Sequence, residues 1–158
     1  MNKIISLISI LFVVFFSGCN ELTGTKILRL GHGLNTSHSV HKGMVHFGEQ
    51  LEELSKGRFK VQIYPSQQLG TERQCVELLQ IGSLDMTKVA AGVLENFAPS
   101  IRVFGIPYMF RDKAHCFNVL DGPIGKELLS GTEQYWLKGL GYYDSGSRSF
   151  YTIDKALE

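Results

Sequence analysis

A strand–helix–strand pattern between residues 27 and 64 restricts the fold of this chain more than any other feature. Residues 27–33 begin with an apolar run and end in Gly-His-Gly, which predicts a strand that stops at glycines. Apolar residues then recur at steps of four and three over residues 39–56, which predicts an amphipathic helix. Residues 58–64 alternate between polar and apolar, which predicts a second strand ended by Pro65. Because these elements form a βαβ unit, the strands are expected to run parallel through a right-handed crossover.

The rest of the chain adds helices and a third strand to this unit. Thr71 and Gln74 predict a capping box at the start of a second helix, and residues 84–89 predict the third strand. Two short helices are expected to begin near Asp112 and Pro123. A hydrophobic content of 44% with 20% charged residues is typical of a globular chain. We therefore expect one α/β domain with a mainly parallel sheet and helices on both faces.

The apolar positions of these elements define an expected core. The first long helix is expected to be capped by Thr36 or Ser37 and to bury Val40, Met44, Phe47, Leu51 and Leu54. The second helix is expected to bury Cys75, Leu78, Leu79 and Ile81. The apolar side is then expected to continue, towards a strand that precedes Arg148, through Ile124, Leu128, Leu129, Trp136, Leu137 and Leu140.

Charge and residue types argue against several classes of function. The net charge of +1 and the pI near 7.7 give no broad basic field for nucleic acid. His38 and His41 are expected to share a helix face, but no partner set follows at the spacing of zinc ligands, so we predict no metal. The sequence shows no nucleophile–base pair and no phosphate loop, so no cofactor is expected. Cys75 and Cys116 are expected to be buried thiols, although an oxidising compartment also permits a disulfide between them.

The amino-terminal residues predict export. Residues 1–18 combine an early lysine, an apolar run shorter than a membrane span and small residues at the end, which is typical of a signal peptide. Phe16-Ser17-Gly18-Cys19 is similar to a bacterial lipobox, which predicts lipid attachment at Cys19; simple cleavage and an uncleaved anchor are the alternatives. Residues 19–26 then form a polar tether. We expect the protein in the periplasm or on the outer face of a bacterial membrane, with membrane contact through the signal or lipid anchor only.

Candidate ligand contacts lie at the carboxyl ends of two of the predicted strands. His32 and Gly33 end the first strand, and Ala90 and Ala91 end the third. In open α/β sheets the carboxyl ends of parallel strands border the ligand crevice, so these residues are candidate ligand contacts. A plain turn at His32 and tight packing at the alanines are the alternatives. Tyr108 follows Pro107 in a predicted bend, where it suits either the core or the wall of a pocket.

The segment GYYDSGSRSFYT at residues 141–152 places one cation among small residues. Arg148 has a rigid fork that binds a carboxylate through two parallel hydrogen bonds, and Ser147 beside it leaves room for a ligand. These two residues are therefore candidates for binding an acid. An exposed arginine in an ordinary turn is the alternative.

This segment, together with YPSQQLGTERQCVELLQIGSLDM and DGPIGKELL, resembles the DctP-type solute-binding receptors of tripartite ATP-independent periplasmic (TRAP) transporters over residues 27–155. The resemblance implies that Arg148 pairs with the carboxylate of a small organic acid, such as a C4-dicarboxylate, a sugar acid or a keto acid, for delivery to a membrane permease. It also implies a two-lobe binding-protein fold, with residues 27–145 as the first lobe and residues 146–158 as the start of a crossover into a second lobe that is missing. Several relatives that bind a sialic acid carry a Glu near this point, whereas this chain has Ala90, which argues against that ligand.

The residues alone leave two other classes of function possible. Tyr143, Asp144 and Arg148 lie in one short segment, which is the argument for an enzyme acting on an organic acid. A structural lipoprotein that binds no ligand is the other alternative. We expect no enzyme activity.

Overall fold

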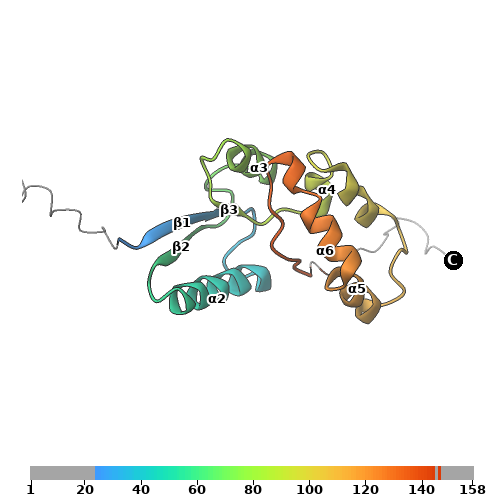
Figure 1. Cartoon of the computed structure of the whole chain (residues 1–158), viewed down its shortest axis with the longest axis horizontal. Coiled ribbons are helices and arrows are strands. Elements are labelled where there is room, and N and C mark those ends of the chain that lie inside the picture. Colours follow the sequence, from blue (N-terminus) through green and yellow to red (C-terminus); the bar gives the residue numbers. More distant parts are fainter. Residues whose placement is uncertain (1–23, 145, 147–158) are drawn as a thin grey trace, which may run out of the picture.

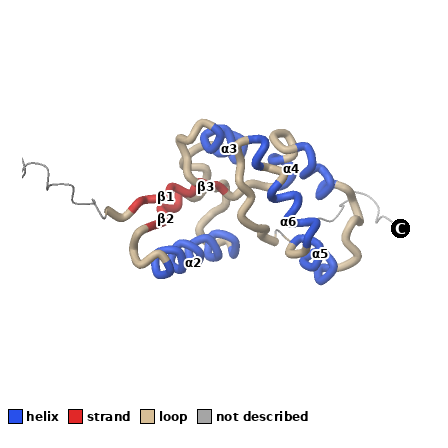
Figure 2. The backbone as a smooth tube through the Cα atoms, in the orientation of Figure 1, coloured by secondary structure: helices blue, strands red, loops and turns tan. Residues whose placement is uncertain are grey.

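The computed structural model describes residues 24–144 and Gly146 of the chain. In chain order the elements are β1 (Lys26–Gly31), α2 (Ser39–Leu54), β2 (Phe59–Tyr64), α3 (Glu72–Gln80), β3 (Met86–Thr87), α4 (Ala91–Leu94), the 3₁₀ helix η1 (Pro99–Gly105), α5 (Lys113–Leu120), α6 (Pro123–Ser130) and the 3₁₀ helix η2 (Glu133–Tyr135). Figure 2 shows how helices and strands alternate along the first half of this order. Within the described part of the chain, no helix is both long and apolar enough to cross a membrane.

The three strands form one parallel sheet in the order β2-β1-β3, with β1 in the centre. Leu30 of β1 lies opposite Ile63 of β2 on one side and Met86 of β3 on the other. Helix α2 packs on β2 across one face, and α3 lies with β3 on the opposite side (Figure 1). The structure therefore confirms the predicted α/β class, the parallel pairing and the helices on both faces.

The N-cap of helix α2 lies one residue after the later of the two predicted caps, Ser37. His38 is the N-cap, and its Nδ1 accepts a hydrogen bond from the Val40 N–H at 3.1 Å. Ser37 is bonded to the preceding turn instead, where its N–H and its Oγ both donate to Asn35 Oδ1. The same cap places His38 outside the helix, so it does not share a helix face with His41 as predicted.

The buried face of α2 agrees with the predicted stripe except at its end. Val40 and Met44 form a cluster with Leu30 of the central strand, and the glycine at position 48 brings α2 close to Val61. Leu54 is 79% exposed, so its predicted burial is wrong. Ser55 is buried at this end instead, where its hydroxyl donates to the Glu52 carbonyl and accepts from the Phe59 N–H.

Helix α3 has the predicted capping box, in which Thr71 Oγ1 accepts from the Gln74 N–H and Gln74 Oε1 accepts from the Thr71 N–H. Cys75 and Val76 are its buried residues, and Gly31 of β1 allows the Cys75 sulfur to approach closely. Ile81 is 72% exposed, contrary to prediction, because it follows the last helical turn. The chain then reverses at the glycine that follows, with a φ of +73°, and buries Leu84 in its place.

Strand β3 has two residues, where a strand over residues 84–89 was predicted. Asp85 anchors its start, because its Oδ2 accepts from the backbone N–H and the Nε of Arg29. These bonds hold the pKa of the Asp85 carboxyl below its ordinary value. Beyond Thr87 the chain leaves the sheet, since the N–H of Ala90 binds Glu72 on α3 instead of a strand.

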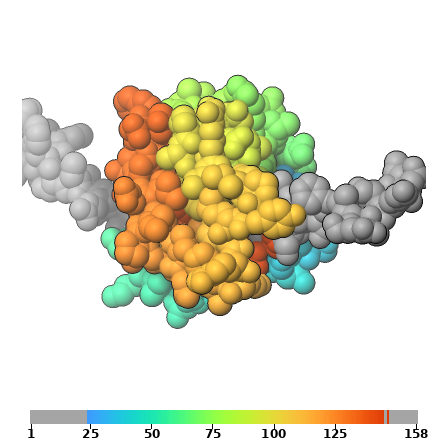
Figure 3. All heavy atoms as spheres, turned by 90° about the vertical axis from the view of Figure 1, so that its right-hand side faces the viewer, coloured from blue at the N-terminus to red at the C-terminus, as the bar shows by residue number. Residues whose placement is uncertain are grey.

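Helices α5 and α6, together with the segment around η1, face the viewer in Figure 3. Asp112 caps α5 by accepting from the His115 N–H, and Pro123 occupies the first turn of α6, both as predicted. Leu137 is buried, but Ile124, Trp136 and Leu140 are exposed, which corrects the predicted apolar side. Trp136 is 83% exposed because its left-handed backbone, with a φ of +61°, turns the chain there.

Residues 137–144 form no strand, although one was predicted before Arg148. Side chains hold this segment instead. Thr132 Oγ1 donates to the Leu137 carbonyl at 2.9 Å and accepts from the Gly139 N–H at 3.1 Å. The Tyr142 hydroxyl donates to the Gly125 carbonyl on α6 at 2.8 Å. An aromatic segment can thus be fixed against helices without joining the sheet.

Candidate functional site

The strand order creates a switch point between β1 and β3. The chain leaves β1 through α2 toward β2, and then returns through α3 to the opposite side of β1. The loops that follow β1 and β3 therefore diverge at one edge of the sheet, which is where open α/β folds bind ligands. His32 and Gly33 follow β1 directly, and Ala90 and Ala91 lie just beyond β3. The structure thus brings these four predicted site residues to the same edge.

His32 is 1% exposed, and its hydrogen bonds fix its tautomer. The Leu34 N–H donates to His32 Nδ1 at 3.1 Å, so Nδ1 carries no proton. The proton is therefore on Nε2, which lies 3.0 Å from Nδ1 of His41 on α2 and donates to it. This order leaves the proton of His41 on its Nε2. Because the His32 ring is enclosed, His41 is the member of this pair that remains partly accessible.

Glu72, in the first turn of α3, connects both loops of this edge. Its Oε1 lies 3.1 Å from Lys88 Nζ, and its Oε2 accepts from the Ala90 N–H at 3.0 Å. A Cβ atom at Gly33 would lie 3.6 Å from Cγ of Glu72, so the loop after β1 runs within van der Waals distance of this side chain. The Lys88 and Glu72 side chains are only 12% and 19% exposed. The two side chains form an ion pair that is largely buried but still partly accessible from solution.

We refer to His32, His41, Glu72 and Lys88 as the polar array. Burial, His41 and Lys88 lower the pKa of His32, in decreasing order of effect, while Glu72 acts in the opposite direction. Of these four residues, only His32 was predicted from the sequence to contact a ligand. Lys88, a lysine within the apolar segment 84–89, could have indicated this ion pair, because a buried lysine requires a partner. Nothing in the sequence identified Glu72 as that partner.

The remaining predicted site residues lie elsewhere. Tyr108 is 89% exposed with a φ of +58°, so it does not belong to the core. Ser147 and Arg148 lie outside the described residues. The segment before them is held on α5, because Lys113 Nζ lies 2.8 Å from Asp144 Oδ2. This hydrogen bond raises the pKa of Lys113 and lowers that of Asp144, which also accepts from the Gly146 N–H.

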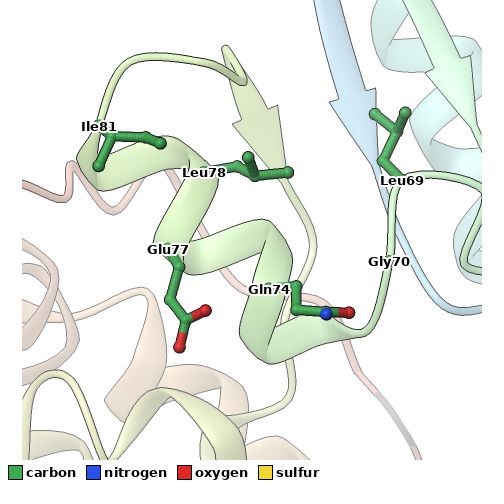
Figure 4. Close-up of a pocket in the computed structure, with 6 residues that line it drawn as sticks. All are labelled: Leu69, Gly70, Gln74, Glu77, Leu78 and Ile81. Atoms are coloured by element: carbon green, nitrogen blue, oxygen red, sulfur yellow. The ribbon is translucent and has the colours of Figure 1, made fainter.

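A shallow pocket of about 380 Å³ lies on α3, away from the polar array (Figure 4). Its lining contains one carboxylate and no cation, so it disfavours an anionic ligand. The residues around it are Leu69, Gly70, Gln74, Glu77, Leu78 and Ile81. We do not assign this pocket to ligand binding.

The cysteines and acidic groups offer no alternative centre in residues 24–144. Cys75 is a buried free thiol, as predicted, and burial raises its pKa. Cys116 is also free but only partly buried. In this part of the chain, no three His, Cys, Asp or Glu side chains lie close enough to hold a metal ion.

The neutral His32 predicts that the protein becomes less stable in mild acid. Its pKa is lowered in the folded state, so the unfolded state binds more protons as the pH falls below about 6.5. The contribution of His32 is fully present above that pH and is lost as the pH falls through its folded pKa. For one proton the slope is at most about 1.4 kcal/mol per pH unit. Urea unfolding between about pH 7.5 and pH 5 measures it.

His32→Asn is expected to flatten this slope, because the titrating ring is removed. His46→Gln is the matched control, since His46 is exposed on the outer face of α2. A slope that His32→Asn leaves unchanged contradicts the assignment.

A parallel sheet with a switch point, bordered by a largely buried polar array, is typical of open α/β folds that bind ligands. Comparisons with known proteins give its family. The model of the bacterial extracellular solute-binding proteins of family 7, DctP, matches residues 30–158. The chain belongs to this family.

Relatives with known names and structures agree with this assignment. YiiZ of Salmonella typhimurium is 41% identical over 81% of the chain and 39% of YiiZ. The C4-dicarboxylate-binding periplasmic protein DctP of Rhodobacter capsulatus is 32% identical over 76% of the chain and 36% of that protein. A TRAP periplasmic solute-binding protein from Bradyrhizobium, solved with α/β-D-galacturonate, is 38% identical with a TM-score of 0.76, over 82% of the chain and 43% of that protein. The chain spans about two fifths of these relatives' length.

Proposed function

We propose that this chain belongs to the extracytoplasmic solute-binding subunit of a TRAP transporter, which captures a small organic acid and delivers it to a membrane permease. The observation that carries the proposal is the position of His32, Gly33 and Ala90 at the switch point of a DctP-family fold. His41 and Lys88 add hydrogen-bond donors to this edge. Related proteins bind D-galacturonate or are named for C4-dicarboxylates, which supports an organic acid as the ligand.

Arg148 is the proposed carboxylate-binding residue. A guanidinium forms two parallel hydrogen bonds with a carboxylate, and these bonds are stronger than those between neutral groups. The segment that leads to it is anchored at Asp144 and Tyr142, so the cation follows a fixed stretch of chain. We propose that the ligand binds at the polar array and that its carboxylate pairs with this cation.

The proposed location is the periplasm, because several relatives carry that word in their names. Export through residues 1–18 and lipid attachment at Cys19 are parts of the same proposal. Binding without chemical conversion is proposed over an enzyme, since the relatives are named as solute-binding proteins.

Arg148→Lys is expected to weaken binding of D-galacturonate about tenfold to a hundredfold, although the charge is kept. An ammonium cannot reproduce the bidentate fork, and a hydrogen bond to a charged group contributes about 1.5–3 kcal/mol. Amide chemical shifts of the 158-residue chain, followed during titration of D-galacturonate into the millimolar range, give the dissociation constant. The shifts of Gly33, Lys88 and Ala90 report on the proposed edge.

The matched control is Arg102→Lys, because Arg102 is exposed on η1. Unchanged affinity with a lower melting temperature in Arg148→Lys would give Arg148 a structural role only. If neither D-galacturonate nor succinate shifts any amide of the unmodified chain, the proposed function is wrong.

A further inference from the structure

The polar array has no net charge, and this limits the ligand groups that it accepts. The bonds of His32 hold both rings of the histidine pair in neutral tautomers. Glu72 and Lys88 carry opposite charges 3.1 Å apart, and these cancel at the distance of a ligand. A second carboxylate placed here would be attracted by Lys88 and repelled by Glu72 to a similar extent. It would lose its hydration without a net electrostatic gain.

The same array has donors and acceptors side by side. Lys88 has three N–H groups, of which one is directed to Glu72. His41 keeps its Nε2–H after accepting from His32. Each Glu72 oxygen accepts one bond, from Lys88 or from Ala90, and retains a further lone pair. A hydroxyl group both donates and accepts, so it satisfies such a site, whereas a carboxylate only accepts.

We propose that the polar array binds hydroxyl groups, so that this chain prefers a polyhydroxy monocarboxylate, a sugar acid, to a C4-dicarboxylate. This inference rests on the proposed function, in which Arg148 takes the one carboxylate. Glu72 and Lys88 are then specificity-determining residues. His32 is a positioning residue, because it orients His41 and stays enclosed itself.

The test compares two probes with the same intact 158-residue chain. D-galacturonate has one carboxylate and several hydroxyls, and succinate has two carboxylates and no hydroxyl. Amide shifts at Gly33, Lys88 and Ala90 give the two dissociation constants. We expect D-galacturonate to bind at least about tenfold more tightly, the effect of one hydrogen bond to a charged group. Succinate that binds as tightly as D-galacturonate, or more tightly, overturns the inference and leaves the proposed function intact.

Glu72→Gln tests the mechanism of this preference. The amide oxygen still accepts from the Ala90 N–H, while Lys88 becomes an uncompensated cation beside the ligand. We expect the preference for D-galacturonate to fall about tenfold, because succinate gains a partner for its second carboxylate. Glu133→Gln is the matched control, since Glu133 pairs with Lys138 at 3.5 Å on the exposed surface. A preference that Glu72→Gln leaves unchanged, in a folded protein, overturns the assignment to the array.

Lys88→Met provides a second variant if Glu72→Gln loses the dispersed amide spectrum of a folded protein. It removes the main donor of the array, so binding of D-galacturonate is expected to weaken by about tenfold or more. Unchanged binding of D-galacturonate overturns the inference. The preference of the unmodified chain decides the question independently of both variants.

Discussion

Gly125→Ala is expected to destabilise the protein by about 3 kcal/mol or more, although alanine favours a helix by about 1 kcal/mol over glycine. Gly125 is buried in the first turn of α6, and a Cβ atom there would overlap the carbonyl oxygen of Leu120 at the end of α5. The overlapping group is backbone, so rotation of a side chain cannot relieve it. The turn between α5 and α6 must open, which also disturbs the Gly125 carbonyl that accepts from Tyr142.

Urea unfolding of Gly125→Ala measures this loss. Gly92→Ala is the matched control, because Gly92 lies in α4 with open space at its Cβ position. That variant is expected to be neutral or up to about 1 kcal/mol more stable. Equal stability of the two variants would show that the α5–α6 turn adapts at little cost.

Met44→Ala is expected to lower the free energy of unfolding by about 2–5 kcal/mol. Met44 is 2% exposed and lies with Val40 of α2 and Leu30 of the central strand. Removal of its side chain leaves a cavity between α2 and the sheet, and the close contact of α2 with Val61 limits how far the helix can move to fill it. The expected loss is a large part of the total stability of a domain of this size.

Val45→Ala is the matched control, since Val45 is the next residue on α2 and is partly exposed. It is expected to change the free energy of unfolding by less than about 1 kcal/mol. A loss below about 1 kcal/mol for Met44→Ala would mean that the core beneath α2 is loosely packed and collapses around the smaller residue.

The local elements of the fold could be predicted because their signals are short-range. The alternation of residues 58–64 and the recurring apolar residues of α2 determine which backbone groups pair and which face is buried. Thr71, Gln74, Asp112 and Pro123 act on backbone groups within a few residues, so sequence suffices to place these helix starts. The edge formed by His32 and Ala90 followed from the rule that parallel strands end together.

Failures of prediction lie where packing competes with local pattern. Leu54 continues the apolar stripe of α2 but is exposed. The turn into β2 buries Ser55 instead, whose hydroxyl accepts from the Phe59 N–H. Residues 84–89 have the composition of a strand, yet β3 has only two residues. The chain then turns away from β1, and the Ala90 N–H binds Glu72 on α3. Trp136 has the most apolar surface of its segment and still faces water, because the backbone reverses there.

The sequence by itself determined that this chain forms a parallel α/β unit and which strand ends border the edge where we propose that the ligand binds. Only the tertiary structure decided what chemistry that edge carries. Lys88 lies 16 residues from Glu72, and His41 lies nine residues from His32. Neither spacing corresponds to a local motif, because the partners come from different elements that meet only after α2 and α3 pack on opposite faces of the sheet. Hydrogen bonds and ion pairs act over a few ångströms in space, whatever the separation along the chain.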